Sequence, residues 1–147
     1  MPTAWPKFFA LALLATLAGV AGCEWFRDAA ESRARFFLET LVREPDNHAR
    51  LNELATPAAG DDPAAVLDGL STQLAIGYLR ARHRQGMALD FAVTAAQHPD
   101  PSHRTVRVAV AAHPAGLRLE RDDRIRFEVA LEMSEEHGWR VTRVSAE

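Results

Sequence analysis

The feature that most constrains the fold is a change in the spacing of apolar residues at Gly86. Before it, apolar residues recur every three or four positions, the period of an amphipathic helix. After it, they alternate with polar residues, the period of a strand with one buried face. Helices that all precede strands with short connections predict an α+β domain with an antiparallel sheet. The helices are expected to cover the apolar face of that sheet, because no other segment remains to do so.

Three helices are predicted, at residues 24–43, at residues 47–55, and from Asp62-Pro63 to about Gln85. Asp62 is a favoured N-cap and Pro63 suits the first helical position. We interpret the aromatic residues of the first helix as core, and Trp25 is also placed to reach a lipid surface. The inward side of the third helix is predicted to carry Val66, Leu67, Leu70, Leu74, Tyr78 and Ala81.

Four strands are predicted at residues 87–94, 105–110, 124–133 and 139–144. The turns between them contain Pro, Gly, Asp or Glu, and the first turn spans residues 98–102. A short continuation at residues 117–120 is also expected. The third strand shows the clearest alternation, with these residues facing the core: Ile125, Phe127, Val129, Leu131 and Met133.

Three helices followed by a four-stranded meander resemble the cone-shaped fold of nuclear-transport-factor-2-like domains. Residues 34–41 followed by 51–56 are similar to the opening of such domains, and Gly138-Trp139-Arg140-Val141 is similar to the last strand of small secreted members. The sequence lacks a clear short strand between its second and third helices. A cystatin-like helix-on-sheet domain is the alternative. The family includes enzymes, transport factors and binding modules, so the resemblance implies no single activity.

The N-terminal segment indicates where the protein resides. Lys7 precedes an apolar run at residues 8–22 that ends in small residues and Cys23, the only cysteine. A positive residue, an apolar core and a small-residue end are typical of a secretory signal peptide. The run is shorter than the about 20 residues of a membrane span.

The tetrapeptide Val20-Ala21-Gly22-Cys23 resembles the lipobox of bacterial lipoprotein precursors. The resemblance implies removal of residues 1–22, a diacylglyceryl group on Cys23, a further acyl chain such as palmitate, and one mature domain at residues 23–147. The alternative, a buried free cysteine, would require Cys23 to belong to the folded domain. In such precursors, Asp directly after the lipidated cysteine retains the protein in the inner membrane, and most other residues allow export to the outer membrane. The residue at this position is Glu24, which resembles the exported kind. We therefore expect a lipid-anchored outer-membrane protein that faces the periplasm of a two-membrane bacterium.

Composition argues against one class of partner. The chain has 17 basic and 20 acidic residues, a net charge of −3, and removal of Lys7 makes it more negative. Nucleic-acid-binding domains usually present a basic face, so we expect no nucleic-acid partner. The length fits a single domain.

Tyr78 and Asp90 are the catalytic candidates, because isomerases and dehydratases of the family use Tyr, Asp or His inside the cone. A carboxylate in an apolar pocket has a raised pKa and can act as a base. The residue pattern favours a simpler interpretation. Asp90 alternates with Leu89 and Phe91 and should face away from the core, while Tyr78 should keep its hydroxyl in water.

His98 and His103 flank the first predicted turn and are placed to approach each other, with Asp100 between them. No HxH or HExxH spacing is present, so solvated histidines are favoured over a metal site, and no cofactor motif occurs. The third helix ends in cations that suit a solvated helix end, or alternatively meet anionic lipid or an acidic partner: Arg80, Arg82 and Arg84.

We therefore expect a lipid-anchored cell-envelope protein whose domain, without enzymatic activity, binds a small apolar ligand or another envelope protein. Two alternatives remain. One is an enzyme of the isomerase or dehydratase kind that works with Tyr78 and Asp90. The other is a structural subunit of an envelope assembly. Polar side chains that converge in a closed pocket between helices and sheet would favour the enzyme. A space filled by Leu, Val and Phe would favour the absence of enzymatic activity.

Overall fold

The computed structural model describes residues 28–55, 62–114 and 124–147. The predicted signal segment, Cys23, Glu24, Trp25 and the strand continuation at residues 117–120 lie outside this range. Within it, the chain forms three α-helices, one 3-10 turn and then four strands, which confirms the α+β class. These elements are α2 (Ala29–Arg43), α3 (His48–Leu54), η2 (Pro63–Val66), α4 (Gly69–Arg84), β1 (Ala88–Asp100), β2 (His103–His113), β3 (Arg124–Ser134) and β4 (Gly138–Ala146).

The strands form one open antiparallel sheet in the order β1-β2-β3-β4, as the short connections predicted. Val106 on β2 lies opposite Val129 on β3, which lies opposite Val144 on β4, so the inward residues form rows across the sheet. The turn predicted at residues 98–102 is narrower than expected, because His98, Pro99 and Asp100 still belong to β1. Proline is tolerated there because β1 is an edge strand.

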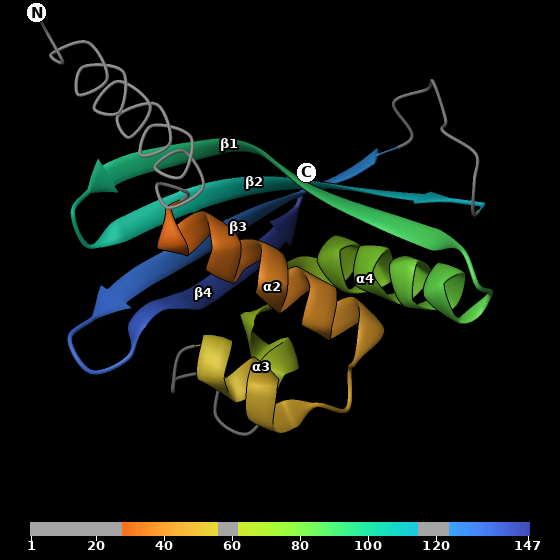
Figure 1. Ribbon diagram of the computed structural model, residues 1–147, viewed down its shortest axis with the longest axis horizontal. Coiled ribbons are helices and arrows are strands. Elements are labelled where there is room, and N and C mark those ends of the chain that lie inside the picture. Colours follow the sequence, from red (N-terminus) through yellow and green to blue (C-terminus); the bar gives the residue numbers. More distant parts are fainter. Residues whose placement is uncertain (1–27, 56–61, 115–123) are drawn as a thin grey trace, which may run out of the picture.

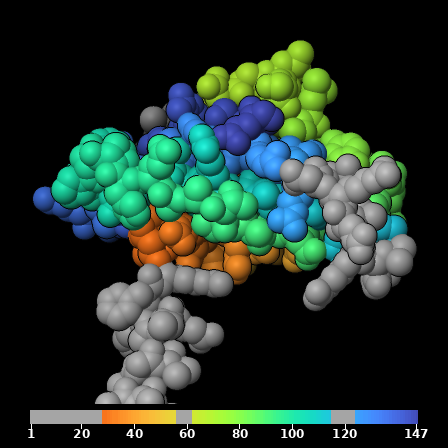
Figure 2. All heavy atoms as spheres, turned by 90° about the horizontal axis from the view of Figure 1, so that it is seen from above, coloured from red at the N-terminus to blue at the C-terminus, as the bar shows by residue number. Residues whose placement is uncertain are grey.

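The helices lie on one side of the sheet, with α2 and α4 next to it and α3 further away (Figure 1). Seen from above the sheet, η2 and the first turns of α4 project at one rim, opposite the start of α2 (Figure 2). The core between α2 and the sheet contains Phe37, Leu38 and Leu41 from the helix and inward residues of all four strands. Burial of this apolar surface is the main favourable contribution to folding.

Two helices begin directly after a residue whose side chain caps them. The Asp28 carboxylate accepts a hydrogen bond from the Ala30 N–H at 3.1 Å and begins α2. The Asn47 side chain accepts one from the Arg50 N–H at 3.3 Å and begins α3. Each cap satisfies an N–H group that has no partner inside its helix.

The prediction of one continuous third helix is wrong. Asp62 caps as expected and accepts from the Ala64 N–H at 2.9 Å, but the turn that follows ends at Val66. The Asp68 N–H then donates to the Val144 carbonyl of β4 at 2.7 Å, and Gly69 takes a φ of +81°. That left-handed conformation favours glycine. α4 begins at Gly69, so its residues face other directions than they would in one helix continuing from Pro63.

The inward side predicted for this helix is wrong from Leu70 onward, whereas Val66 is buried and Leu67 packs against the core as predicted. Thr72, Ile76 and Leu79 are the buried residues of α4. In contrast, Leu70, Leu74 and Tyr78 have exposed fractions of 69%, 65% and 47%.

Two further residues deviate from their predicted burial. Phe36 on α2 and Met133 at the end of β3 are exposed, whereas the neighbouring Phe37 and Leu131 are buried. Phe36 lies one step around the helix from the buried row, and the guanidinium groups of Arg35 and Arg50 lie over its ring.

The outer edge of β4 is partly covered by the segment before α4. Ala55 and Leu67 form single parallel bridges to Val141 and Val144. They lie between α3 and α4, where the sequence showed no clear short strand. Buried Arg140 on β4 donates to the Asn52 carbonyl of α3. These bonds fix α3 and η2 to the last strand.

Candidate functional site

A recess of about 370 Å³ opens between the C-terminal half of α4 and the sheet. Six of its seven lining residues are apolar or aromatic, and the seventh is an arginine: Tyr78, Leu79, Met87, Val110, Ala112, Ile125 and Arg82. Clefts of a few hundred Å³ lined by apolar side chains and a few polar groups are typical of small-molecule sites.

The walls of the recess follow from local structure. Val110 and Ala112 alternate on the inward side of β2, and Ile125 lies directly opposite Val110 on β3. Gly86, with a φ of +80°, turns the chain from α4 into β1, and the Met87 N–H bonds back to the Arg82 carbonyl at 3.1 Å. This return places the flexible Met87 side chain beside the helix end.

The polar part of the recess is formed by Tyr78 and Arg82 of α4. The Arg82 guanidinium lies 5.0 Å from the centre of the Tyr78 ring, a cation–π arrangement. Its Nη1 donates to the Gln85 side-chain oxygen at 3.2 Å. A guanidinium has five N–H donors, so this group retains donors for an anionic partner.

The structure does not bring Tyr78 and Asp90 into one site. Asp90 lies opposite Ala111 in the β1–β2 register, on the sheet face turned away from the recess, as its alternation predicted. Its carboxylate lies 2.7 Å from His113 Nε2, and His113 Nδ1 lies 3.1 Å from the Pro114 carbonyl. These two acceptors raise the pKa of His113, the Asp90 carboxylate most, because each bonds an N–H of the imidazolium. With both nitrogens engaged, His113 is a cross-strand link and not a free base.

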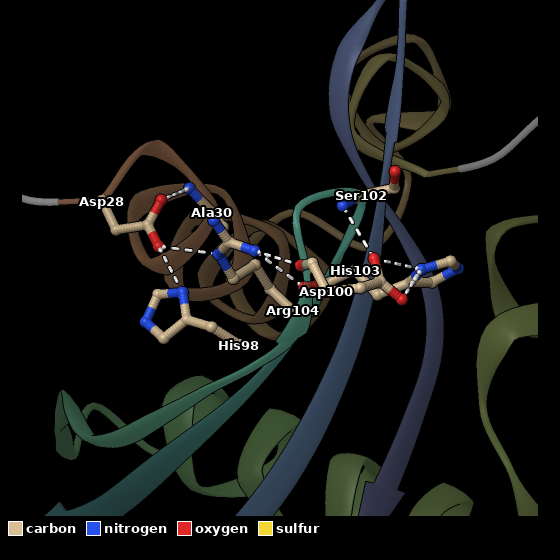
Figure 3. A network of polar contacts seen from close by, with 7 residues as sticks. All are labelled: Asp28, Ala30, His98, Asp100, Ser102, His103 and Arg104. Atoms are coloured by element: carbon tan, nitrogen blue, oxygen red, sulfur yellow. Dashed lines mark hydrogen bonds and ion pairs between the residues drawn. The ribbon is translucent and has the colours of Figure 1, made fainter.

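A second polar cluster joins the start of α2 to the β1–β2 hairpin end (Figure 3). Arg104 donates to the Asp28 carboxylate at 3.3 Å and to the Asp100 carbonyl at 2.8 Å. The Arg104 guanidinium also lies 4.7 Å from the Trp139 ring centre. The cluster therefore ties together α2, the hairpin and β4.

His98 and His103 do not meet, contrary to the expected approach. His103 Nδ1 lies 2.8 Å from the Asp100 carboxylate, while His98 Nδ1 lies 3.9 Å from Asp28 (Figure 3). The pKa of Asp100 is lowered, first by the hydrogen bond from His103 and then by the Ser102 N–H. Among the described residues, no group of three or more His, Cys, Asp or Glu side chains is arranged to hold a metal ion.

The three arginines of the α4 end do not form one cationic face. Arg80 Nε donates to the Leu41 carbonyl of α2 at 2.9 Å, and burial lowers the pKa of this arginine. Arg82 lies at the recess, and Arg84 is exposed. The sequence did not single out Arg82 from its neighbours, because only the rotation of α4 decides which one reaches the sheet.

A second recess of about 310 Å³ lies between α2 and β1 and is more polar, with Glu31, Ser32 and Arg35 on the α2 side. No helix in residues 28–55, 62–114 and 124–147 has the length and apolar character needed to cross a membrane.

No protein-family model matches the chain, and no curated protein resembles it at a significant level.

Proposed function

We propose that this protein is a lipid-anchored component of a bacterial cell envelope whose domain binds a small apolar ligand with an acidic group. The single observation that carries the binding role is the recess between α4 and the sheet. Its apolar wall suits a hydrocarbon or ring system, and Arg82 at the same site suits a carboxylate or sulfonate.

The nuclear-transport-factor-2-like fold is part of this proposal. Three helices on one side of an open four-stranded antiparallel sheet, with a recess between helix and sheet, support it over a cystatin-like domain. The fold alone would not select a ligand, so the argument for the ligand rests on the lining residues.

Binding is favoured over an isomerase or dehydratase reaction by the arrangement of the titratable groups. Acid–base catalysis requires a base within hydrogen-bond reach of the substrate. Asp90 and His113 lie on the opposite sheet face, and Tyr78 is the only titratable side chain besides Arg82 among the recess residues. The enzyme hypothesis would therefore need a base from outside this lining.

The anchor is proposed from Cys23 and its context in the sequence. Asp28, which joins α2 to the β1–β2 hairpin end, follows Cys23 by five residues. A chain of that length spans at most about 18 Å. The polar cluster of Asp28 would then lie close to the lipid surface, with the outer membrane as the expected location.

The ligand proposal is tested with decanoate as the probe, by calorimetric titration of the protein. Ala112→Phe should fill the recess and remove binding, because Ala112 lines it. Ala111→Phe is the matched control, since Ala111 lies on the same strand and faces the other side. Arg82→Gln should weaken binding about tenfold or more, the usual range for a charged hydrogen bond, whereas Arg84→Gln should not. Equal binding by all four variants would contradict the proposal.

The anchor is tested separately by membrane fractionation. Cys23→Ser should release the domain or leave an uncleaved precursor, and a variant that matures and stays with membranes would refute lipidation. Glu24→Asp should move the protein from the outer to the inner membrane. Wild-type protein found only in the inner membrane would refute the sorting proposal while lipidation stands.

A further inference from the structure

The outer face of α4 is a second apolar surface that the fold leaves uncovered, and it adjoins the recess at Tyr78, which belongs to both. Leu70, Leu74 and Tyr78 follow one another at four-residue steps and are exposed, while Thr72, Ile76 and Leu79 face the core. A helix that is apolar on both sides is normally buried on both sides. Contiguous exposed apolar side chains mark an interaction surface. We refer to Leu70, Leu74, Gly77, Tyr78 and Ala81 as the outer face.

Gly77 at the centre of this face is unexplained by the domain itself. A Cβ added there would meet nothing within 4 Å, and its φ is an ordinary helical one. Glycine inside a helix costs about 1 kcal/mol relative to alanine. Small residues at a helix surface allow a second backbone to approach closely. Along this face the large residues alternate with the small ones, in the order Leu74, Gly77, Tyr78, Ala81.

This surface lies away from the end at which the proposed anchor joins the domain. In Figure 2 the first turns of α4 project at the rim opposite the start of α2. The lipid next to the anchor is therefore not the best occupant.

We propose that the outer face binds the same face of a second copy, with the two α4 helices antiparallel and crossing near Gly77. Around a two-fold axis at that point, Tyr78 of each copy packs on Gly77 of the other, and Leu74 packs on Ala81. A large residue thus meets a small one at each contact, which a self-complementary interface requires.

The charges of α4 select the antiparallel direction. Asp68 precedes the helix, is exposed and makes no capping hydrogen bond, while the exposed Arg84 lies in the last turn. An antiparallel pair brings the Asp68 end of one helix to the Arg84 end of the other. A parallel pair would place like charges together, which is unfavourable at both ends.

The test uses the full-length chain in its own membranes. Gly77→Cys places a thiol at the proposed two-fold axis, and mild oxidation should give a species of twice the chain mass on a non-reducing gel. Ala29→Cys, an exposed position on α2, is the matched control and should not cross-link. A Gly77→Cys product of any other mass, or no product, would overturn the proposal.

Purified full-length protein in detergent provides the second measurement, by light scattering with correction for bound detergent. The wild type should have the mass of a dimer. Leu74→Arg and Gly77→Leu should weaken association about tenfold or more, with unchanged circular dichroism, because neither side chain contacts the core. A monomeric wild type, or a dimer unaffected by both changes, would overturn the proposal. Leu74 and Gly77 do not line the recess, so decanoate binding should persist in both variants. If the wild type fails to bind decanoate at all, the dimer proposal still stands.

Discussion

The two long helices, α2 and α4, have 15 and 16 residues but differ in the number of faces that the fold uses. α2 buries one continuous row that includes Ala30, Ala34, Phe37 and Leu41. α4 has two apolar rows, and the sequence alone favoured the wrong one. Periodicity predicts that a segment is helical, but it fixes the inward side only when one row is apolar. The second apolar row of α4 is the surface for which we propose a second copy as partner.

The largest expected effect separates the two rows of α4. Ile76→Asp should destabilise the domain by about 4 kcal/mol or more, because it places a charge at a buried position. Leu74→Asp should leave the monomer close to wild-type stability, since Leu74 is exposed. Urea denaturation at a protein concentration low enough to keep the chain monomeric measures both. Equal loss in the two variants would show that the rotation of α4 is different from that described.

A smaller pair of effects is expected on α2, from two adjacent aromatic residues. Phe37→Ala should cost about 3–5 kcal/mol, the usual range for truncating a buried phenylalanine. Phe36→Ala should cost less than about 1 kcal/mol, because it loses only exposed contacts with two arginines. Thermal unfolding followed by circular dichroism distinguishes them. A larger loss for Phe36 would indicate that α2 also uses two faces.

Glycine substitutions test what sets the rotation of α4. Gly69→Ala should destabilise by about 1–2 kcal/mol, because the left-handed conformation at this position disfavours a Cβ. Gly77→Ala should stabilise the monomer by up to about 1 kcal/mol. Opposite signs in urea denaturation are the expected result. If Gly69→Ala proves neutral, the junction with η2 does not determine the helix rotation.

The smallest effect is expected away from both helices, on the outer sheet face. The folded-state pKa of His113 is raised above its ordinary value of 6.5, mainly by Asp90. The ion pair therefore stabilises the fold fully below about pH 6.5, and this contribution is lost as pH rises through the folded-state pKa. Asp90→Asn should lower the urea midpoint slightly at pH 5.5 and by less at pH 9, because deprotonation of His113 removes the ion pair. A difference that is equal at both pH values would rule out the linkage.

Most of the fold was predictable because its signals are local. The alternation of β3 and the cap at Asp62 each depend on neighbouring residues, and each appears in the structure. The break at Gly69 was missed because it depends on a bond from Asp68 to Val144, far along the chain. Arg140 was missed as a buried residue for a similar reason, since its acceptor is a carbonyl of α3.

The candidate site was less predictable than the fold. Tyr78 was singled out for its chemistry and does line the recess, but as one wall and without Asp90. Met87, Val110 and Ile125 have no chemical signal in the sequence. They meet because the β2–β3 register and the return of the chain at Gly86 bring them together. Lipidation of Cys23 remains a prediction from the sequence.

The bonds between β4 and the helices also determine when the helices can pack during synthesis of the chain. β4 is made after the helices, yet the Ala146 N–H bonds to the Thr72 hydroxyl of α4 at 2.8 Å, and Val144 and Arg140 hold the segments before α4 and within α3. A ribosome releases the helices first, when the strand that they require has not been synthesised. The helices should therefore stay unpacked until β4 has emerged. A nascent chain in that state remains threadable, which is the condition that export through a narrow translocation channel imposes.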